Sequence, residues 1–273
     1  YTITIPQGED ARLVIDVQAE EGASAAFLFR LEKGASLSLT WKLTGGDREG
    51  TCVLAAYYEL AEDAGLHVSR LESGLTKTII YDQRHSVLAA RARADFYAAE
   101  LGGEKIIVHS YGKLSGDHSE MNERAIYAGR GRQHLDFFYH IDHVGKKTKA
   151  EIDLKGALAD ESKKIFRGTL DFKRGCAGSV GDEGDFAIQL DPKTKNISLP
   201  LLLCTEDDVQ GNHASSAGQL DQNTIYFLMS RGFTLEEARR IVVEALIRPI
   251  IDGMDEALRE EVLNAVRMKL DRE

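Results

Sequence analysis

Short runs in which apolar and polar residues alternate fill the chain from residue 1 to about residue 210, and glycines separate many of them. An internal echo makes the pattern explicit, because Gly22-Ala-Ser24 and Gly34-Ala-Ser36 lie twelve residues apart and an alternating run follows each. Alternation with a period of two predicts β-strands. Repeated short strands with glycine punctuation are typical both of stacked β-coils and of a β-sandwich, and the pattern fits these two folds equally well.

The pattern becomes helical after Asp221, which is the predicted N-cap of a helix that runs to Ser230 and ends at Gly232. Thr234 and Glu237 have the spacing of a capping box for a second helix. The predicted apolar face of this second helix consists of Leu235, Ala238, Ile241, Val242, Ala245 and Leu246.

Pro249 is expected to kink or end the second helix, and Gly253 to close it. Asp255 is the predicted cap of a last helix. Its predicted inner face is Leu258, Val262, Leu263, Val266 and Leu270. We expect the helices to pack on the open end of the strand region and to hide its edge strands. The predicted division is therefore a strand core over residues 1–215 and a helical segment over residues 216–273.

The overall composition limits the classes of partner. A chain of 273 residues with 43% hydrophobic residues can form one large domain, or a domain with an appendage. Its net charge of −10 argues against binding to nucleic acid or to an anionic membrane. No apolar run approaches the ~20 residues that span a bilayer. The start at Tyr1 does not resemble a signal peptide, so a cytoplasmic protein is expected, and the lack of an initial Met is compatible with a fragment.

Three cysteines, Cys52, Cys176 and Cys204, are distributed without any Cys-x-x-Cys spacing. An odd number of unpaired cysteines suits a reducing cytoplasm. The spacing also offers no self-contained metal knuckle.

The clearest predicted strand, from Gln133 to His143, gives the first candidate site. One face of this strand carries His134, Asp136, Phe138, His140 and Asp142. Two histidines and two aspartates on one face could ligate a divalent metal, or they could form an ordinary polar outer face with charge pairing. The two histidines lie six residues apart, or roughly 20 Å along a strand, so they could share a metal only if the strand bent sharply.

A second candidate is an acidic cluster at Asp182, Glu183 and Asp185, after a glycine-rich turn that lacks the Gly-Lys-Ser/Thr of a phosphate loop. Pairs of carboxylates support glycosidase chemistry, and this alternative would make the protein a β-helix carbohydrate-active enzyme. Aspartate and glutamate together number 44, so acidic clusters of this kind arise freely.

The stretch from Leu199 to Gly232 adds a family resemblance. It contains Pro200, Asp207-Asp208-Val209, His213, Gly218-Gln219-Leu220-Asp221, Tyr226-Phe227-Leu228 and Ser230-Arg231-Gly232. In order and spacing, these residues resemble the C-terminal signature of the SufB/SufD proteins of iron–sulfur cluster assembly. Leu154–Ser162 and Phe166–Leu170 resemble two further segments of that family. One departure matters, because Gly211 occupies the position of the family's cysteine.

The resemblance implies a right-handed parallel β-helix with a C-terminal α-helical segment, without the family's N-terminal helical domain. It implies a SufD-like scaffold that is not an enzyme and pairs with a SufB-like subunit or with a second copy of itself. It further implies binding to a SufC-like ABC-type ATPase. The residues that we expect at this ATPase contact are Tyr226, Phe227, Arg231, Arg239 and Arg240.

His213 is the candidate interface ligand for iron or a cluster, and we place it in a loop of small residues between the strands and the helices. Because Gly211 has no thiol, the cysteine would come from a partner; the nearest one in sequence, Cys204, is expected to be a strand residue. We therefore expect no cofactor bound stably by this chain alone, but a transient iron–sulfur cluster or iron in a complex. A homodimeric β-helix of the same family without a cluster role is the alternative.

Overall fold

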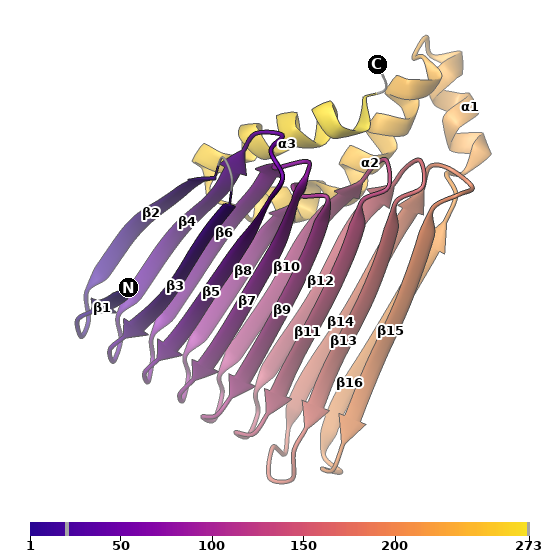
Figure 1. Ribbon diagram of the computed structural model, residues 1–273. Helices are drawn as coiled ribbons and strands as arrows, with labels where there is room; N and C mark the ends of the chain where they lie inside the picture. Colours follow the sequence, from indigo (N-terminus) through magenta and orange to yellow (C-terminus); the bar gives the residue numbers. More distant parts are fainter. Residues whose placement is uncertain (20–21, 272–273) are drawn as a thin grey trace.

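In the computed structural model, which describes residues 1–19 and 22–271, sixteen strands wind into a parallel β-helix and three helices follow (Figure 1). Consecutive strands alternate between two eight-stranded sheets, so that each coil gives one strand to each sheet. Strands in neighbouring coils pair in parallel. This topology confirms the predicted β-helix and excludes the alternative of a β-sandwich.

One sheet contains the odd-numbered strands, which are β1 (Thr2–Ile5), β3 (Gly22–Leu31), β5 (Gly50–Leu60), β7 (Thr78–Leu88), β9 (Lys105–Leu114), β11 (His134–His143), β13 (Lys163–Phe172) and β15 (Lys195–Cys204). The other contains the even-numbered strands, which are β2 (Asp10–Ala19), β4 (Ser36–Gly45), β6 (Gly65–Gly74), β8 (Arg93–Glu100), β10 (Glu120–Gly129), β12 (Lys149–Leu158), β14 (Ser179–Gln189) and β16 (Val209–Gly218).

The glycine echo marks half-coils rather than whole coils. Gly22 begins β3 in one sheet, whereas Ser36 begins β4 in the other. Lateral partners are farther apart in sequence, since Ser36 pairs with Gly65 and Gly65 with Arg93, which makes these coils 29 and 28 residues long. The stretch Ser86–Tyr97 is divided in the same way, because a turn after Leu88 sends the chain from β7 to β8.

From β1 to β14, each turn from an odd to an even strand contains a left-handed backbone position, which glycine adopts most easily. Gly34 fills it between β3 and β4 with φ 68°. In later coils Asp63, Arg91 and His118 fill it with φ values of 62°, 57° and 60°. The repeated glycine is therefore replaced by other residues in later coils, although the left-handed turn position is retained.

Inward-pointing side chains fill the β-helix with a stacked apolar core. Phe29 and Tyr58 come from adjacent coils, and their rings stack with centroids 5.1 Å apart. Trp41, Phe137 and Phe166 are also buried. In-register pairing places similar side chains above one another, and this lateral stacking gives each coil its stability.

A charged network interrupts this core in the middle of the stack. Arg70, Glu72, Asp82, Arg84 and Glu100 are all at most 1% exposed. The guanidinium of Arg84 lies 2.6 Å from both Asp82 and Glu100, and that of Arg70 lies 2.5 Å from Asp82. Each of these four charges is thus compensated by an opposite charge from its own or a neighbouring strand.

The three helices are α1 (Gln222–Ser230), α2 (Leu235–Asp252) and α3 (Glu256–Leu270). Their predicted caps are confirmed, since Asp221 accepts from the first turn of α1, Thr234 and Glu237 form the capping box, and Asp255 caps α3. Gly253 is the C-cap of α2. The last strand ends at Gly218, slightly beyond the expected boundary at residue 215.

The helices do not cover the open end of the β-helix, and that expectation was wrong. Instead α2 and α3 lie along one side of the stack, across the ends of even-numbered strands (Figure 1). Leu71, Ala99 and Ile126, which lie near the carboxyl ends of β6, β8 and β10, are buried against these helices. A ready apolar surface on the side of the stack therefore determines where the helices pack.

The buried stripe of α2 also differs from the prediction. The buried residues are Ala238, Val243, Ile247, Ile250 and Ile251. Of the expected face only Ala238 is buried, while Ile241, Val242 and Leu246 are half-buried and Leu235 and Ala245 are exposed. The helix continues through Pro249, so its apolar stripe extends to Ile251. The inner face of α3 is confirmed, with Leu258, Val262 and Val266 buried and Leu263 and Leu270 packed at its margin.

Candidate functional site at the open end of the β-helix

Among the residues that the structure describes, the last coil, formed by β15 and β16, has a strand neighbour on one side only. β15 pairs with β13, and β16 pairs with β14 (Figure 1). Every residue of β16 after Val209 is exposed. Ile197, Leu199, Leu201 and Leu203 of β15 form an exposed apolar row. Such an unpaired edge offers both backbone hydrogen bonds and apolar surface to another strand.

His213 lies on β16, so the expectation that it sits in a loop was wrong. Its register partner on β14 is Glu183. Paired residues of a parallel sheet project to the same face, and Glu183 is buried inside the coil. The imidazole therefore belongs to the inner face of β16, at the mouth of the β-helix, where it is exposed because no coil follows.

Gly211 lies on the same inner face, two residues before His213. A Cβ atom built on Gly211 would lie 3.1 Å from Cε2 of Phe172 and 3.4 Å from Cδ1 of Leu202. A cysteine at this position would therefore need only a small shift of the Phe172 ring. Its thiol would share the mouth of the coil with His213.

Glu183 is the unusual group beneath His213, and in the sequence it stands out only as part of an acidic cluster. Among the described residues, neither of its carboxyl oxygens has a hydrogen-bond partner. Burial, together with the charge of Asp185, raises the pKa of Glu183 to about 7. Gly168 makes room for it, since a Cβ there would lie 2.0 Å from the Glu183 carboxylate.

The acidic cluster is divided between the two faces of β14. Asp182 points outward and accepts a hydrogen bond from Asn212 at 2.9 Å. Asp185 points inward and is paired with the buried ammonium of Lys164. Only Glu183 and Asp185 thus share a face, and the alternation of inward and outward positions around Gly184 was the signal for it.

The cysteines occupy different environments. Cys52 and Cys176 are buried, and burial raises the pKa of both thiols. Cys204 is exposed at the end of β15, where its thiol donates to the carbonyl of Glu206 at 2.9 Å. Cys204 is a strand residue, as expected.

The five residues expected at an ATPase contact fall into two groups. On α1, Tyr226 and Phe227 are 75% and 54% exposed, and the guanidinium of Arg231 lies 4.9 Å above the Phe227 ring. On α2, Arg239 pairs with Glu236, and Arg240 pairs with Asp271 at 3.0 Å. The exposed aromatic surface thus belongs to α1, and the α2 arginines are held in ion pairs.

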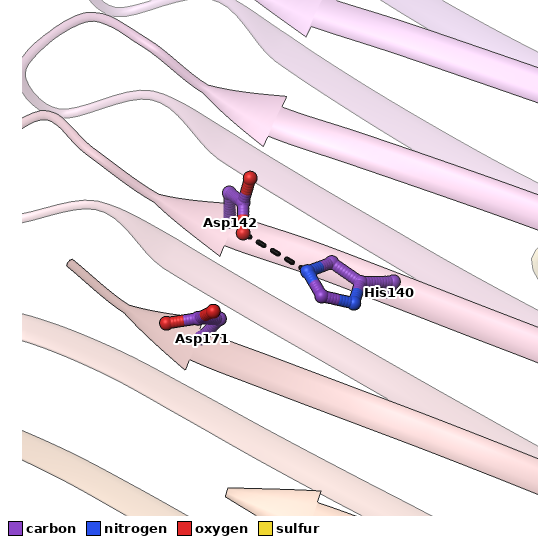
Figure 2. A group of neighbouring side chains, drawn as sticks. All are labelled: His140, Asp142 and Asp171. Carbon is purple, nitrogen blue, oxygen red and sulfur yellow. Dashed lines mark hydrogen bonds and ion pairs between the residues drawn. The ribbon is translucent and has the colours of Figure 1, made fainter. Parts of the chain in front are cut away.

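The metal candidate on β11 gains a residue from the next coil. His140, Asp142 and Asp171 offer three ligand atoms within 4.8 Å of one another (Figure 2). However, these groups already have hydrogen-bond or ion-pair partners. His140 Nε2 lies 2.9 Å from Asp142, and Lys173 Nζ lies 2.5 Å from Asp171. His134 and Asp136 stay outside the group, as their spacing along the strand predicted.

The fold is that of a β-solenoid whose exposed last coil carries His213, and the site is therefore an open edge rather than a closed pocket. The family model for "SUF system FeS cluster assembly, SufBD core domain" matches residues 14–246. The chain therefore belongs to the SufB/SufD family.

Three relatives illustrate the similarity. The chain is 26% identical over 204 residues to the iron–sulfur cluster assembly protein SufD of Bacillus subtilis. The aligned region covers 74% of this chain and 46% of that protein. It is 20% identical over 210 residues to SufD of Escherichia coli, covering 76% and 50%. It is 21% identical over 189 residues to SufB of Bacillus subtilis, covering 69% and 40%. The chain thus spans about half the length of these relatives or less.

In the described part of the chain, no helix combines the length and the apolar character needed to cross a membrane.

Proposed function

We propose that this chain is a SufD-like scaffold subunit for iron–sulfur cluster assembly in the cytoplasm and that it catalyses no reaction by itself. The observation that carries the proposal is the position of His213, on the inner face of the last coil, whose outer edge has no strand partner among the described residues. Membership of the SufB/SufD family supports the class of function.

In this proposal a SufB-like subunit or a second copy of the chain adds its own edge strand beside β15 and β16. The exposed apolar row on β15 and the free edge of β16 support such a contact. His213 then supplies a neutral imidazole nitrogen to iron or to a transient cluster, and the partner supplies the thiolate that Gly211 lacks. Iron and sulfur are cargo here rather than resident cofactors.

The test is His213→Ala in the assembled complex, measured as the rate of anaerobic cluster formation by visible absorbance. The side chain is exposed, so folding and partner binding should persist while the rate falls at least tenfold. Asn212→Ala is the matched control, because Asn212 lies on the outer face of the same strand and should leave the rate unchanged. An unaltered rate in a folded, fully assembled His213→Ala complex would remove this role.

A SufC-like ABC-type ATPase is the proposed partner of the helical segment. Exposed Tyr226 and Phe227 on α1, with Arg231 at its C-cap, support this contact, and Arg239 and Arg240 lie on the adjoining helix. Tyr226→Ala/Phe227→Ala should abolish pull-down of the ATPase, whereas Met268→Ala, at an exposed apolar residue of α3, should not. Retained binding by a folded variant without Asp221–Glu273 would exclude the helical segment as the docking site.

Gly211 favours a second candidate, a homodimeric β-helix of this family without a cluster role. Anaerobic co-expression with SufB-like and SufC-like proteins separates the two candidates. Co-purification with absorbance from a cluster supports the scaffold, and a colourless homodimer supports the alternative.

A further inference from the structure

A row of basic side chains crosses the outer face of the odd-numbered sheet. Lys105 on β9, His134 on β11, Lys163 on β13 and Lys195 on β15 are successive register partners. Neighbouring strands lie about 4.8 Å apart, so the backbone positions of these four residues form one line across the sheet with that spacing. The residues that follow them on β9, β11 and β13, namely Ile106, Leu135 and Lys164, point inward and are buried, which places the row on the outside.

The row is not compensated within the described part of the chain. The side chains of Lys105, Lys163 and Lys195 form no hydrogen bond or ion pair there, and the buried Nε2 of His134 has no partner. Burial and the ammonium groups of Lys163 and Lys105 hold the pKa of His134 below its ordinary value. Like charges on adjacent strands destabilise a sheet, so this arrangement carries a cost.

At other outward positions of the same sheet, basic side chains are paired with carboxylates on a neighbouring strand. Arg30 pairs with Glu59 across two strands at 2.7 Å. Arg167 pairs with Asp136, again across neighbouring strands. In a chain with a net charge of −10, carboxylates are abundant, yet none of those in the described residues pairs with the three lysines of the row. A bound anion would remove the repulsion between these like charges.

The row ends in a groove of about 600 Å³ beside the turn that precedes β15. Arg132, His134, Lys163 and Lys195 line it, and Arg132 forms no hydrogen bond or ion pair within the described residues. Glu161 is the lone carboxylate among its lining residues, and it is paired with Lys193 at 2.8 Å. The groove thus presents several uncompensated donors to one small volume.

We propose that this groove binds a small anion carrying two or three linked phosphate groups, held by Lys163, Lys195 and Arg132, with His134 as a further donor. Lysine and arginine are strong donors to phosphate oxygens. An acidic peptide fits less well, because carboxylates on one face of an extended chain recur only every ~6.8 Å, a wider spacing than that of the row. This site does not depend on the cluster role of His213.

Tripolyphosphate is the probe, with sodium sulfate at equal ionic strength as the control anion. Because a ligand that binds only the folded state raises its melting temperature, tripolyphosphate should stabilise the full chain well beyond sulfate. Lys163→Gln should weaken binding, measured by isothermal titration calorimetry, about tenfold, as expected for one charge-assisted contact. Lys33→Gln removes an equal charge at a paired site far from the groove and should leave binding unchanged.

A second readout separates binding from a structural role. Without ligand, Lys163→Gln should raise the melting temperature at low salt, because it relieves repulsion within the row. A lower melting temperature, equal shifts with sulfate and tripolyphosphate, or unchanged affinity in Lys163→Gln would each overturn the proposal. A decaglutamate peptide that binds more tightly than tripolyphosphate would overturn it in favour of an acidic protein segment.

Discussion

The middle of the β-helix and its open end contain similar polar side chains in opposite circumstances. In the middle, Asp82 and Glu100 are buried against Arg70 and Arg84, which neighbouring strands supply. At the open end, Glu183 is buried without a partner among the described residues. Glu183 lies on β14, one strand in from the open edge, between β12 and β16. The two regions therefore differ in whether an arginine faces the buried carboxylate, and the carboxylate that lacks a partner among the described residues lies next to His213.

The largest expected effect comes from breaking the closed network with Arg84→Met. This change leaves Glu100 buried without its ion partner and should lower the free energy of unfolding by about 3–5 kcal/mol. Urea denaturation measures the loss. Adding Glu100→Gln should recover part of it, since the uncompensated charge is removed as well. A loss below 1 kcal/mol would show that the network is open to water.

The next effect is pH-dependent and tests the open end. The pKa of Glu183 is about 7 in the folded chain, against an ordinary value of 4.5. The folded state therefore holds this proton more tightly, and the stabilisation present below pH 4.5 is lost as the pH rises through 7. Relative to Glu183→Gln, the parent chain should lose about 3 kcal/mol across this window.

The difference between variant and parent is the quantity to follow, because His143, with a pKa lowered to about 4, contributes with the opposite sign. Glu123→Gln in the middle of the stack is a positive control and should show a similar pH-dependent difference, because burial raises the pKa of Glu123 to about 7 as well. A difference for Glu183→Gln that does not vary with pH would contradict the buried, uncompensated carboxyl.

Blocking the open edge should have a smaller effect. Leu201→Lys places a charge in the exposed apolar row of β15 and should weaken the proposed homodimer about tenfold, or roughly 1.4 kcal/mol. Light scattering across a dilution series measures it. Val14→Lys, at an exposed apolar position of β2 near the opposite end, is the control. A parent chain that is already monomeric at micromolar concentration would refute self-association.

The smallest effect is expected at an exposed ion pair. Arg30→Met removes the partner of Glu59, and both side chains are about half exposed. Solvent screens such a pair, so the free energy of unfolding should change by less than about 0.5 kcal/mol. A loss comparable with that of Arg84→Met would mean that burial does not distinguish the two kinds of pair.

The sequence by itself determined the local elements and the family. Alternation predicted the strands, and Asp221, Thr234, Glu237 and Asp255 predicted the helix starts, because capping depends on residues only two or three positions apart. The signature around His213 predicted the family that the comparison then showed.

Only the tertiary structure decided which residues became lateral neighbours. Asp171 joins His140 from the following coil, Glu183 comes to lie beside His213, and Lys163 comes to lie between His134 and Lys195. These pairings depend on the length of each coil, which is near thirty residues. The turns determine that length, and no short-range sequence pattern reveals it. The helices likewise packed where the strands happened to end in apolar residues. Local periodicity specifies each strand, but the stacking of coils specifies the site.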